Sequence, residues 1–321
     1  MLKTNRLKVG TYILNTMPSN HRWHNLAMKS FHDYFSRFDI KINVLDDKHY
    51  LVRQMMQHEG IHALLRKALR WYDFLDSDND YGLFLDLDTV ILSKSKDVRD
   101  YCRGENYITW MKGFEDGKLP KRWVSIKNRE FTLVRKFMLE ELWRRNPSMS
   151  KDCLKFNTGF SLLNRSFVES LVQGMGKLGF DLSKNTGLEN LKEFQLSANK
   201  LIPKDCTSTL NPAGYVGECE IKRKFEKVHI HDEHIMELSI PFDDVNKLNL
   251  ASDESFQDLA VHSYTVSYKT DQISEDHTGR PFDLLNYDIT KFCKYYKKAI
   301  FFHLQVPHKD ETMLRYMEMF G

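Results

Sequence analysis

Asp86 and Asp88 are the residues whose type and spacing most directly indicate chemistry. They follow the apolar run Leu83-Phe84-Leu85, which is typical of a buried parallel strand. In an extended chain, side chains two residues apart leave the same side of the backbone. Two like charges buried together need a compensating cation or proton. The pattern therefore favours a divalent metal at the carboxyl end of a central strand, although an Asp-x-Asp triplet also fits a plain turn at a strand end.

Two β-α units precede this strand and must position it. Residues 7–14 and 40–45 are predicted strands, and apolar residues recur at helical spacing over residues 21–38 and 52–75. Strands that alternate with helices over short connections predict a parallel sheet, wound like a nucleotide-binding half-domain.

The second half of the chain supplies further polar segments beside apolar strands. Residues 156–159 are predicted to form a polar turn that opens a strand, and His262 falls in a late strand. Residues 166–174 and 189–201 are predicted helices. His303 follows an apolar run; it is interpreted as a strand-end histidine, with the acceptor side of a site as the alternative.

Composition and charge narrow the class of protein. The chain has 321 residues, a length that is enough for one substantial α/β domain whose core needs no disulfide bonds. Its formal net charge is +3. Its five scattered cysteines form no Cys-x-x-Cys pair, which argues against a disulfide framework and fits a reducing compartment. No apolar run reaches the ~18 residues of a membrane span. We therefore expect a soluble cytoplasmic protein.

Three of these elements stand in an order that resembles the GT-A-fold glycosyltransferases, which use nucleotide-sugar donors and a divalent metal. The elements are the strand ending in Asp86 and Asp88, the segment Phe156-Asn157-Thr158-Gly159-Phe160, and His262 ahead of Ser267-Tyr268-Lys269. The resemblance covers residues 7–269. It implies a Rossmann-like mixed α/β sheet flanked by helices in a domain of residues 1–269. Residues 270–321 would be a helical and strand extension packed on that domain.

The resemblance also assigns roles to residues. It implies a site for Mn²⁺ or Mg²⁺ made by Asp86, Asp88 and His262. Asp88 would bind the metal and the donor diphosphate directly, and Asp86 would hold the donor ribose or support the metal from outside its direct ligands. Asn157 and Gly159 resemble the turn that touches the donor sugar. Further donor contacts are expected at Thr11, Tyr12, Arg22, Arg70 and Lys269. The loop before Lys269 departs from the family pattern, and each arginine also fits a surface or helix-pairing role.

The implied reaction is transfer of a sugar from a nucleotide-sugar, with a UDP-sugar as the first choice, to an acceptor hydroxyl. A nucleoside diphosphate leaves readily only when its developing charge is neutralised, and a carboxylate-held metal with a Lys or Arg does this. An inverting reaction also needs a general base. Glu193 and Glu189 are candidates for that base, although both also fit the exposed side of an amphipathic helix.

The acceptor is expected to be a cell-surface glycan or a hydroxylated base in DNA. Basic clusters such as Lys222-Arg223-Lys224 and aromatic residues such as Trp123 and Tyr295-Tyr296 support the DNA alternative, because charge and stacking suit a base flipped out of the duplex. They also fit ordinary solvated surfaces.

Two other functions compete with the transferase. Asp86-Leu87-Asp88-Thr89-Val90 fits the loop of haloacid-dehalogenase-type phosphatases, in which Asp86 would be the nucleophile, and Asp243-Asp244 the later acidic pair. That motif normally opens its domain, whereas two β-α units precede it here. A non-catalytic nucleic-acid-binding protein would account for the basic clusters alone.

Two further motifs are interpreted as structural. Gly174-Met175-Gly176-Lys177-Leu178-Gly179 has the letters of a dinucleotide fingerprint but follows a predicted helix, so it is interpreted as a helix stop. His229 and His231 would share one face of a strand, with His234 close by. Without a fourth ligand or a nearby cysteine, they are interpreted as a surface cluster in preference to a zinc site.

Overall fold

The computed structural model describes residues 7–15, 22–112, 126–148, 154–202, 229–240, 246–262 and 299–303, together with residues 314 and 318. Several residues of the sequence-based expectations lie outside these ranges, among them Trp123, Lys222-Arg223-Lys224, Asp243-Asp244, Lys269 and Tyr295-Tyr296.

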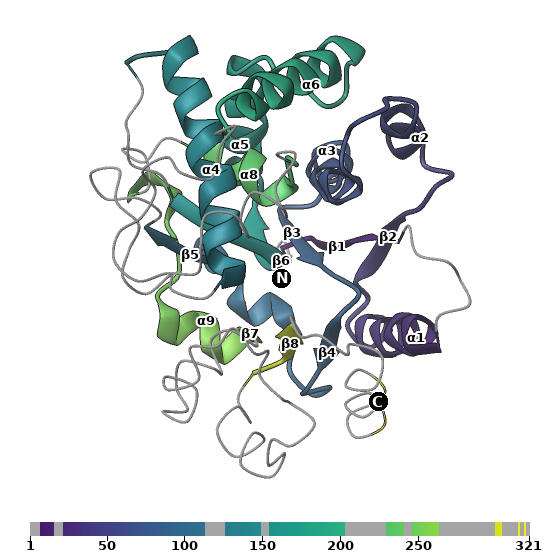
Figure 1. The fold of residues 1–321 in the computed structure, drawn as a ribbon. Coiled ribbons are helices and arrows are strands. Elements are labelled where there is room, and N and C mark those ends of the chain that lie inside the picture. Colours follow the sequence, from purple (N-terminus) through teal and green to yellow (C-terminus); the bar gives the residue numbers. More distant parts are fainter. Residues whose placement is uncertain are drawn as a thin grey trace.

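The central sheet has the strand order β2-β1-β3-β6-β5 (Figure 1). β1 (Val9–Leu14) pairs in parallel with β2 (Lys41–Leu45) and with β3 (Tyr81–Leu85). β6 (Leu154–Asn164) is antiparallel to both β3 and β5 (Tyr107–Lys112). Helices connect β1 to β2 and β2 to β3, as parallel pairing requires. The predicted mixed α/β sheet flanked by helices is therefore confirmed.

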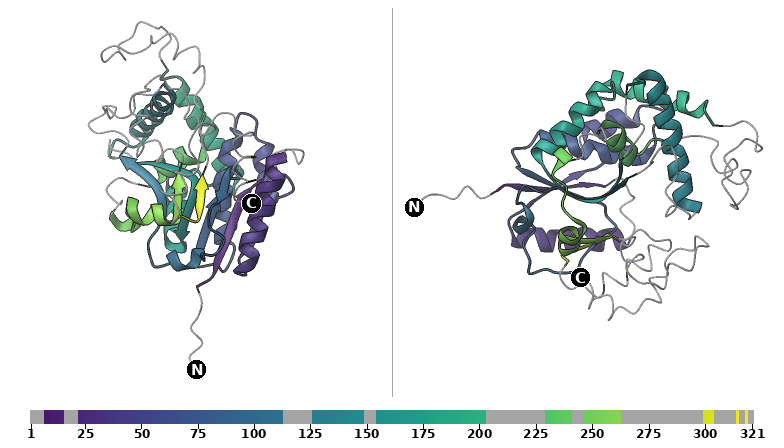
Figure 2. Two further views of the ribbon diagram at one scale, coloured as in Figure 1. Left: turned by 90° about the horizontal axis from the view of Figure 1, so that it is seen from below. Right: turned by 90° about the vertical axis from the view of Figure 1, so that its left-hand side faces the viewer.

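Helices cover both faces of this sheet (Figure 2). One face carries α1 (Arg22–Arg37). The other carries a thicker helical layer, made of α2 (Tyr50–Met56), η1 (Ala63–Ala68), α3 (Leu69–Leu75), α4 (Ile126–Arg145), α5 (Arg165–Lys177), α6 (Asn185–Asn199) and α8 (Asp232–Ser239). Within the described residues, none of the helices combines the length and the apolar character that crossing a bilayer would need.

A second, three-stranded sheet lies on the α1 side, with the order β4-β8-β7. β8 (Phe301–His303) is antiparallel to β4 (Thr89–Ile91) and parallel to β7 (Ala260–His262). The short helices η2 (Val98–Tyr101) and α9 (Asp253–Leu259) precede β5 and β7. β8 comes from the predicted C-terminal extension yet is the middle strand of this sheet. The boundary near residue 269 stays a prediction.

The alternation of side chains along the strands divides the apolar residues into two cores. Tyr12 and Phe84 pack under the thick helical layer, whereas Ile13, Leu83 and Leu85 pack towards α1 and the second sheet. These strands are buried on both faces, which is why they read as continuous apolar runs in the sequence.

The expected turn at residues 156–159 is wrong, because these residues lie inside β6. There the pairing with β5 jumps from Ser161, opposite Ile108, to Asn157, opposite Thr109. The irregularity reverses the alternation: Phe156 faces the thick helical layer, whereas Phe160 and Leu162 face the other core.

The single helix expected over residues 52–75 is also wrong. The chain forms α2, η1 and α3 instead, and the break after α2 contains Gly60 with a φ of +86°. That left-handed conformation suits glycine and ends a helix readily. The break matters for the site because it lets η1 and α3 run separately over the end of β3.

Candidate metal centre

Asp86 and Asp88 lie in a turn at the end of β3. The extended conformation expected for them is wrong. β3 ends at Leu85, the amide of Asp86 donates to the carbonyl oxygen of Gly159 (2.9 Å), and the amide of Thr89 donates back to the carbonyl oxygen of Asp86 (3.1 Å). The turn carries the chain from the central sheet into β4. It lies at the carboxyl end of β3, beside the point where the strand order reverses between β1 and β3, which is where open α/β sheets bind ligands.

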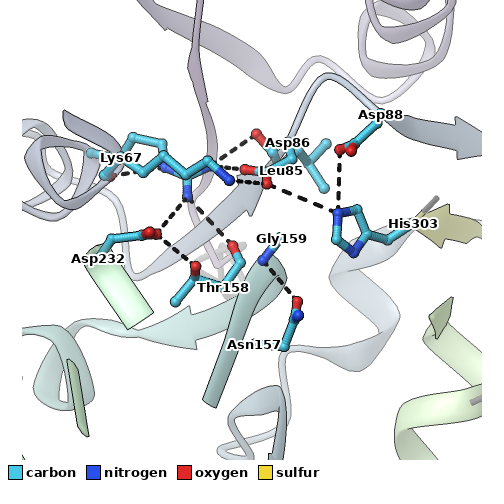
Figure 3. A network of polar contacts seen from close by, with 10 residues as sticks. Lys67, Leu85, Asp86, Asp88, Asn157, Thr158, Gly159, Asp232 and His303 are labelled. Carbon is cyan, nitrogen blue, oxygen red and sulfur yellow. Dashed lines mark hydrogen bonds and ion pairs between the residues drawn. The ribbon is translucent and has the colours of Figure 1, made fainter. Parts of the chain in front are cut away.

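His303 completes a group of three metal-binding side chains with the two aspartates (Figure 3). Its Nε2 lies 3.2 Å from Oδ1 of Asp88 and 3.9 Å from Oδ2 of Asp86. One ligand atom from each of the three residues lies within 4.8 Å of the others. His303 is in register with Thr89 across β4 and β8, so pairing in the second sheet brings the imidazole to the turn.

Close packing against His303 explains why residue 159 is a glycine. A Cβ built on Gly159 would overlap the ring of His303 at Cε1, Nε2 and Nδ1. The imidazole therefore packs directly against the backbone of β6, at the irregularity where β6 departs from regular pairing with β5. Only glycine lets the backbone of β6 lie this close to the imidazole with His303 in this position.

Two cations from the helical layer hold Asp86 from the other side. Lys67, on η1, pairs through Nζ with Oδ2 of Asp86. Arg70, on α3, is fully buried, and its Nη1 donates to Oδ1 of Asp86 (3.2 Å) and to the carbonyl oxygen of Leu85 (2.9 Å). Its Nε donates to the carbonyl oxygen of Lys67 (3.0 Å). Both oxygens of the Asp86 carboxylate thus face a cation.

Asp232 is a third carboxylate in the network. It is the first residue of α8, and its Oδ2 accepts a hydrogen bond from Oγ1 of Thr158 (2.6 Å) and lies 3.8 Å from Nη2 of Arg70. Burial raises the pKa of Asp232, although Lys67 and Arg70 oppose the rise. Burial alone would lower the pKa of Lys67, but Asp86, Asp232 and Asp88 together hold it above its ordinary value. Lys67 therefore stays charged.

The other predicted donor contacts fall in different surroundings. Thr11 and Tyr12 are fully buried in β1, and Tyr12 packs against Phe74 and Phe84 with its hydroxyl donating to Ser77 Oγ (2.8 Å). Arg22 begins α1, but its side chain lies outside what the structure describes. Asn157 is half-buried, and its Oδ1 accepts from the amide of Gly159 (3.1 Å). Among the predicted donor contacts whose side chains the structure describes, Arg70 is the one that contacts the Asp86 carboxylate.

Glu189 and Glu193 are exposed on α6, which packs chiefly on α4. In the described part of the chain, no hydrogen bond or ion pair joins them to Asp86 or Asp88. Their assignment as general base stays a prediction.

The expected metal ligand His262 ends β7, with its backbone in register with His303. Its side chain is outside what the structure describes, so its role as a ligand stays a prediction. Sequence reasoning missed His303, Lys67 and Asp232 as members of the network. One signal for His303 was present: the apolar run Ile300-Phe301-Phe302 ends at it just as Leu83-Phe84-Leu85 ends at Asp86.

The expected strand around His229 and His231 is wrong, because His231 is the N-cap of α8. His231 stacks on His62, the N-cap of η1, with ring centroids 4.5 Å apart and an interplanar angle of 12°. Burial, followed by the neighbouring His62 and Lys67, lowers the pKa of His231 to about 3. The histidines thus join the starts of the two helices that carry Lys67 and Asp232.

The Gly174–Gly179 segment ends a helix, as predicted. α5 continues to Lys177, and Gly179 follows it with a φ of +80°.

Comparison with known proteins gives distant similarity only. No protein-family model matches the sequence, and no curated protein matches it. One similar solved structure is a glycosyltransferase involved in the glycosylation of the major capsid of PBCV-1 (TM-score 0.40, 9% identity, 96% of this chain and 99% of that chain).

Two further similar structures are of LgtC. One is an active-site mutant (TM-score 0.39, 13% identity, 97% of this chain and 94% of that chain). The other is the galactosyltransferase LgtC in complex with donor and acceptor sugar analogs (TM-score 0.37, 12% identity, 97% and 96%). All three TM-scores lie below 0.5, so these structures carry no assignment of function to this chain.

Proposed function

We propose that the protein is a metal-dependent glycosyltransferase that uses a nucleotide-sugar donor. The observation that carries the proposal is the convergence of Asp86, Asp88 and His303 at the carboxyl end of β3, beside Lys67 and Arg70. A divalent-cation site next to positively charged side chains suits a nucleoside diphosphate, whose negative charge grows as the sugar departs.

The three side chains fit a divalent cation. Two carboxylates and an imidazole suit Mn²⁺, and the carboxylates also suit Mg²⁺. A bound cation would supply positive charge against the departing diphosphate.

The residues around the ligands keep them in place. Arg70 fixes the Asp86 carboxylate and at the same time caps the last carbonyl of β3. Gly159 leaves room for the His303 ring, and the pairing of β8 with β4 sets the height of that ring above the turn. Ligands held by packing and hydrogen bonds bind without further ordering, which is what catalysis of this kind requires.

For the donor, a UDP-sugar is the first class to test, and for the acceptor a glycan. The DNA alternative has no support among the described residues. One basic pair, Arg144-Arg145, lies in the last turn of α4, and Arg145 makes contacts within the protein. Its Nε donates to Glu141 (2.8 Å), and its guanidinium lies 5.2 Å from the centroid of the Phe194 ring.

The test is release of UDP from a panel of UDP-sugars, with Mn²⁺ and a glycan acceptor, by wild type and by Asp88→Asn. We expect turnover that chelation abolishes and that Asp88→Asn lowers by about 100-fold or more. Glu169→Gln, an exposed position on α5, is the matched carboxylate control. Release of phosphate from a generic phosphate ester, without any UDP-sugar turnover, would replace the proposal with the phosphatase alternative.

A further inference from the structure

The oxygen of Asp86 that faces His303 already has a cationic partner. Oδ2 of Asp86 lies 3.9 Å from Nε2 of His303, and the same Oδ2 is paired with Nζ of Lys67. Figure 3 shows the ammonium and the imidazole on opposite sides of this carboxylate. Oδ1, the other oxygen, accepts from Arg70. A metal bound by Asp86 together with His303 would therefore meet an ammonium on the oxygen that it needs.

We propose that Lys67 and the divalent metal compete for Oδ2 of Asp86, so that metal binding requires Lys67 to leave this carboxylate. The proposal rests on the proposed function, because it takes Asp86, Asp88 and His303 as the metal ligands. It goes beyond that function by giving Lys67 a role: its ammonium neutralises the Asp86 carboxylate until the metal binds.

The electrostatics of the network favour competition over sharing. Asp86 is paired with two cations, Lys67 and Arg70, and Arg70 also lies 3.8 Å from Asp232. Lys67 and Asp86 are only 21% and 11% exposed, so water screens a divalent ion poorly from an ammonium on the same oxygen. Arg70 has three backbone carbonyls as partners and cannot leave easily. The Lys67 ammonium, by contrast, is held by its pair with Asp86 and is 21% exposed, so it is the cation that we expect to move.

A second carboxylate, Asp232, belongs to the same buried network. Asp232 begins α8, which packs against η1, the helix that carries Lys67, and its Oδ2 lies 3.8 Å from Nη2 of Arg70. The ammonium can therefore turn away from Asp86 without becoming a buried charge that lacks a counter-ion. In that position it would still lie beside the metal site, where a diphosphate would bind.

The test is direct titration of Mn²⁺, measured by calorimetry and by the electron paramagnetic resonance signal of free Mn²⁺, without any nucleotide or turnover. We expect Lys67→Met to bind Mn²⁺ about tenfold more tightly than wild type or better, because the competing charge is gone. Lys67→Arg should keep the weaker affinity. Lys192→Met, on the exposed side of α6, controls for loss of a lysine elsewhere.

Thermal unfolding gives a second readout. Lys67→Met should lower the melting temperature of the metal-free protein, because Asp86 loses one counter-charge, and added Mn²⁺ should raise it more than it does for wild type.

Two results would overturn the inference. Equal or weaker Mn²⁺ binding by Lys67→Met, with Asp88→Asn still abolishing the binding, would overturn competition by Lys67 and leave the metal-dependent function standing. Absence of Mn²⁺ binding in wild type, Lys67→Met and Asp88→Asn alike would overturn the metal site itself, and the inference with it.

Discussion

Gly159→Ala tests the close packing that positions His303. The new Cβ would overlap three atoms of the imidazole, which itself is 1% exposed and has no room to move freely. Overpacking of this kind costs about 1–3 kcal/mol. The matched control is Gly176→Ala, where a Cβ would meet nothing within 4 Å and, in a helix, should stabilise by about 0.5–1 kcal/mol.

The assay is urea unfolding of wild type, Gly159→Ala, His303→Ala and the double variant, with Gly176→Ala alongside. If the ring causes the penalty, Gly159→Ala should cost less than about 0.5 kcal/mol in the His303→Ala background, so the cycle gives a coupling of about 1 kcal/mol or more. A Gly159→Ala variant as stable as Gly176→Ala would refute the reasoning. So would the same penalty with and without the ring, because the strain would then lie in the backbone of β6.

Two further predictions follow from the buried network and from the histidine pair. Arg70→Ala should lower the free energy of unfolding in urea by about 3–5 kcal/mol, because it removes a counter-charge from buried Asp86 and a hydrogen-bond donor from the Leu85 carbonyl. Arg70→Lys should restore little of this loss. A nearly unchanged free energy of unfolding in either variant would contradict the role of Arg70. The pKa of His231 is lowered to about 3, so the unfolded chain takes up a proton near pH 6.5 that the folded chain refuses, and stability should fall as pH drops from about 7 towards 3. Between pH 7 and 5 this amounts to about 1–2 kcal/mol, which His231→Gln should remove from the pH dependence; His32→Gln, at an exposed histidine of α1, measures the effect of losing a histidine as such.

The sheet could be predicted because its signals are local. The runs before Leu14 and Leu85 are apolar because β1 and β3 are buried on both faces, and the helices between β1, β2 and β3 allow the parallel pairing. The same logic located Asp86 and Asp88 at a strand end. It placed them in an extended chain, however, because the triplet fits both an extended strand and a turn at a strand end. In the structure, the amide of Thr89 donates to the carbonyl oxygen of Asp86 and closes the turn.

Apart from Arg70, the other members of the network around Asp86 could not be predicted, because they depend on contacts between distant segments. His303 reaches the site through β8, a strand of three residues whose pairing with β4 leaves no periodic pattern. Lys67 falls inside the single helix predicted over residues 52–75. In the structure it lies on η1, a separate helix after the break at Gly60, and pairs with Asp86. Asp232 was hidden because His229 and His231 alternate as in a strand, while the chain begins a helix there.

The central claim is that Asp86, Asp88 and His303 share one divalent cation that binds a nucleotide. The most direct measurement is calorimetric titration of UDP, with Mn²⁺ and again with chelator, on wild type, His303→Gln and His262→Gln. We expect metal-dependent UDP binding in wild type and in His262→Gln, and its loss in His303→Gln. Binding that survives in His303→Gln but disappears in His262→Gln would contradict the site and restore the ligand set expected from the sequence alone.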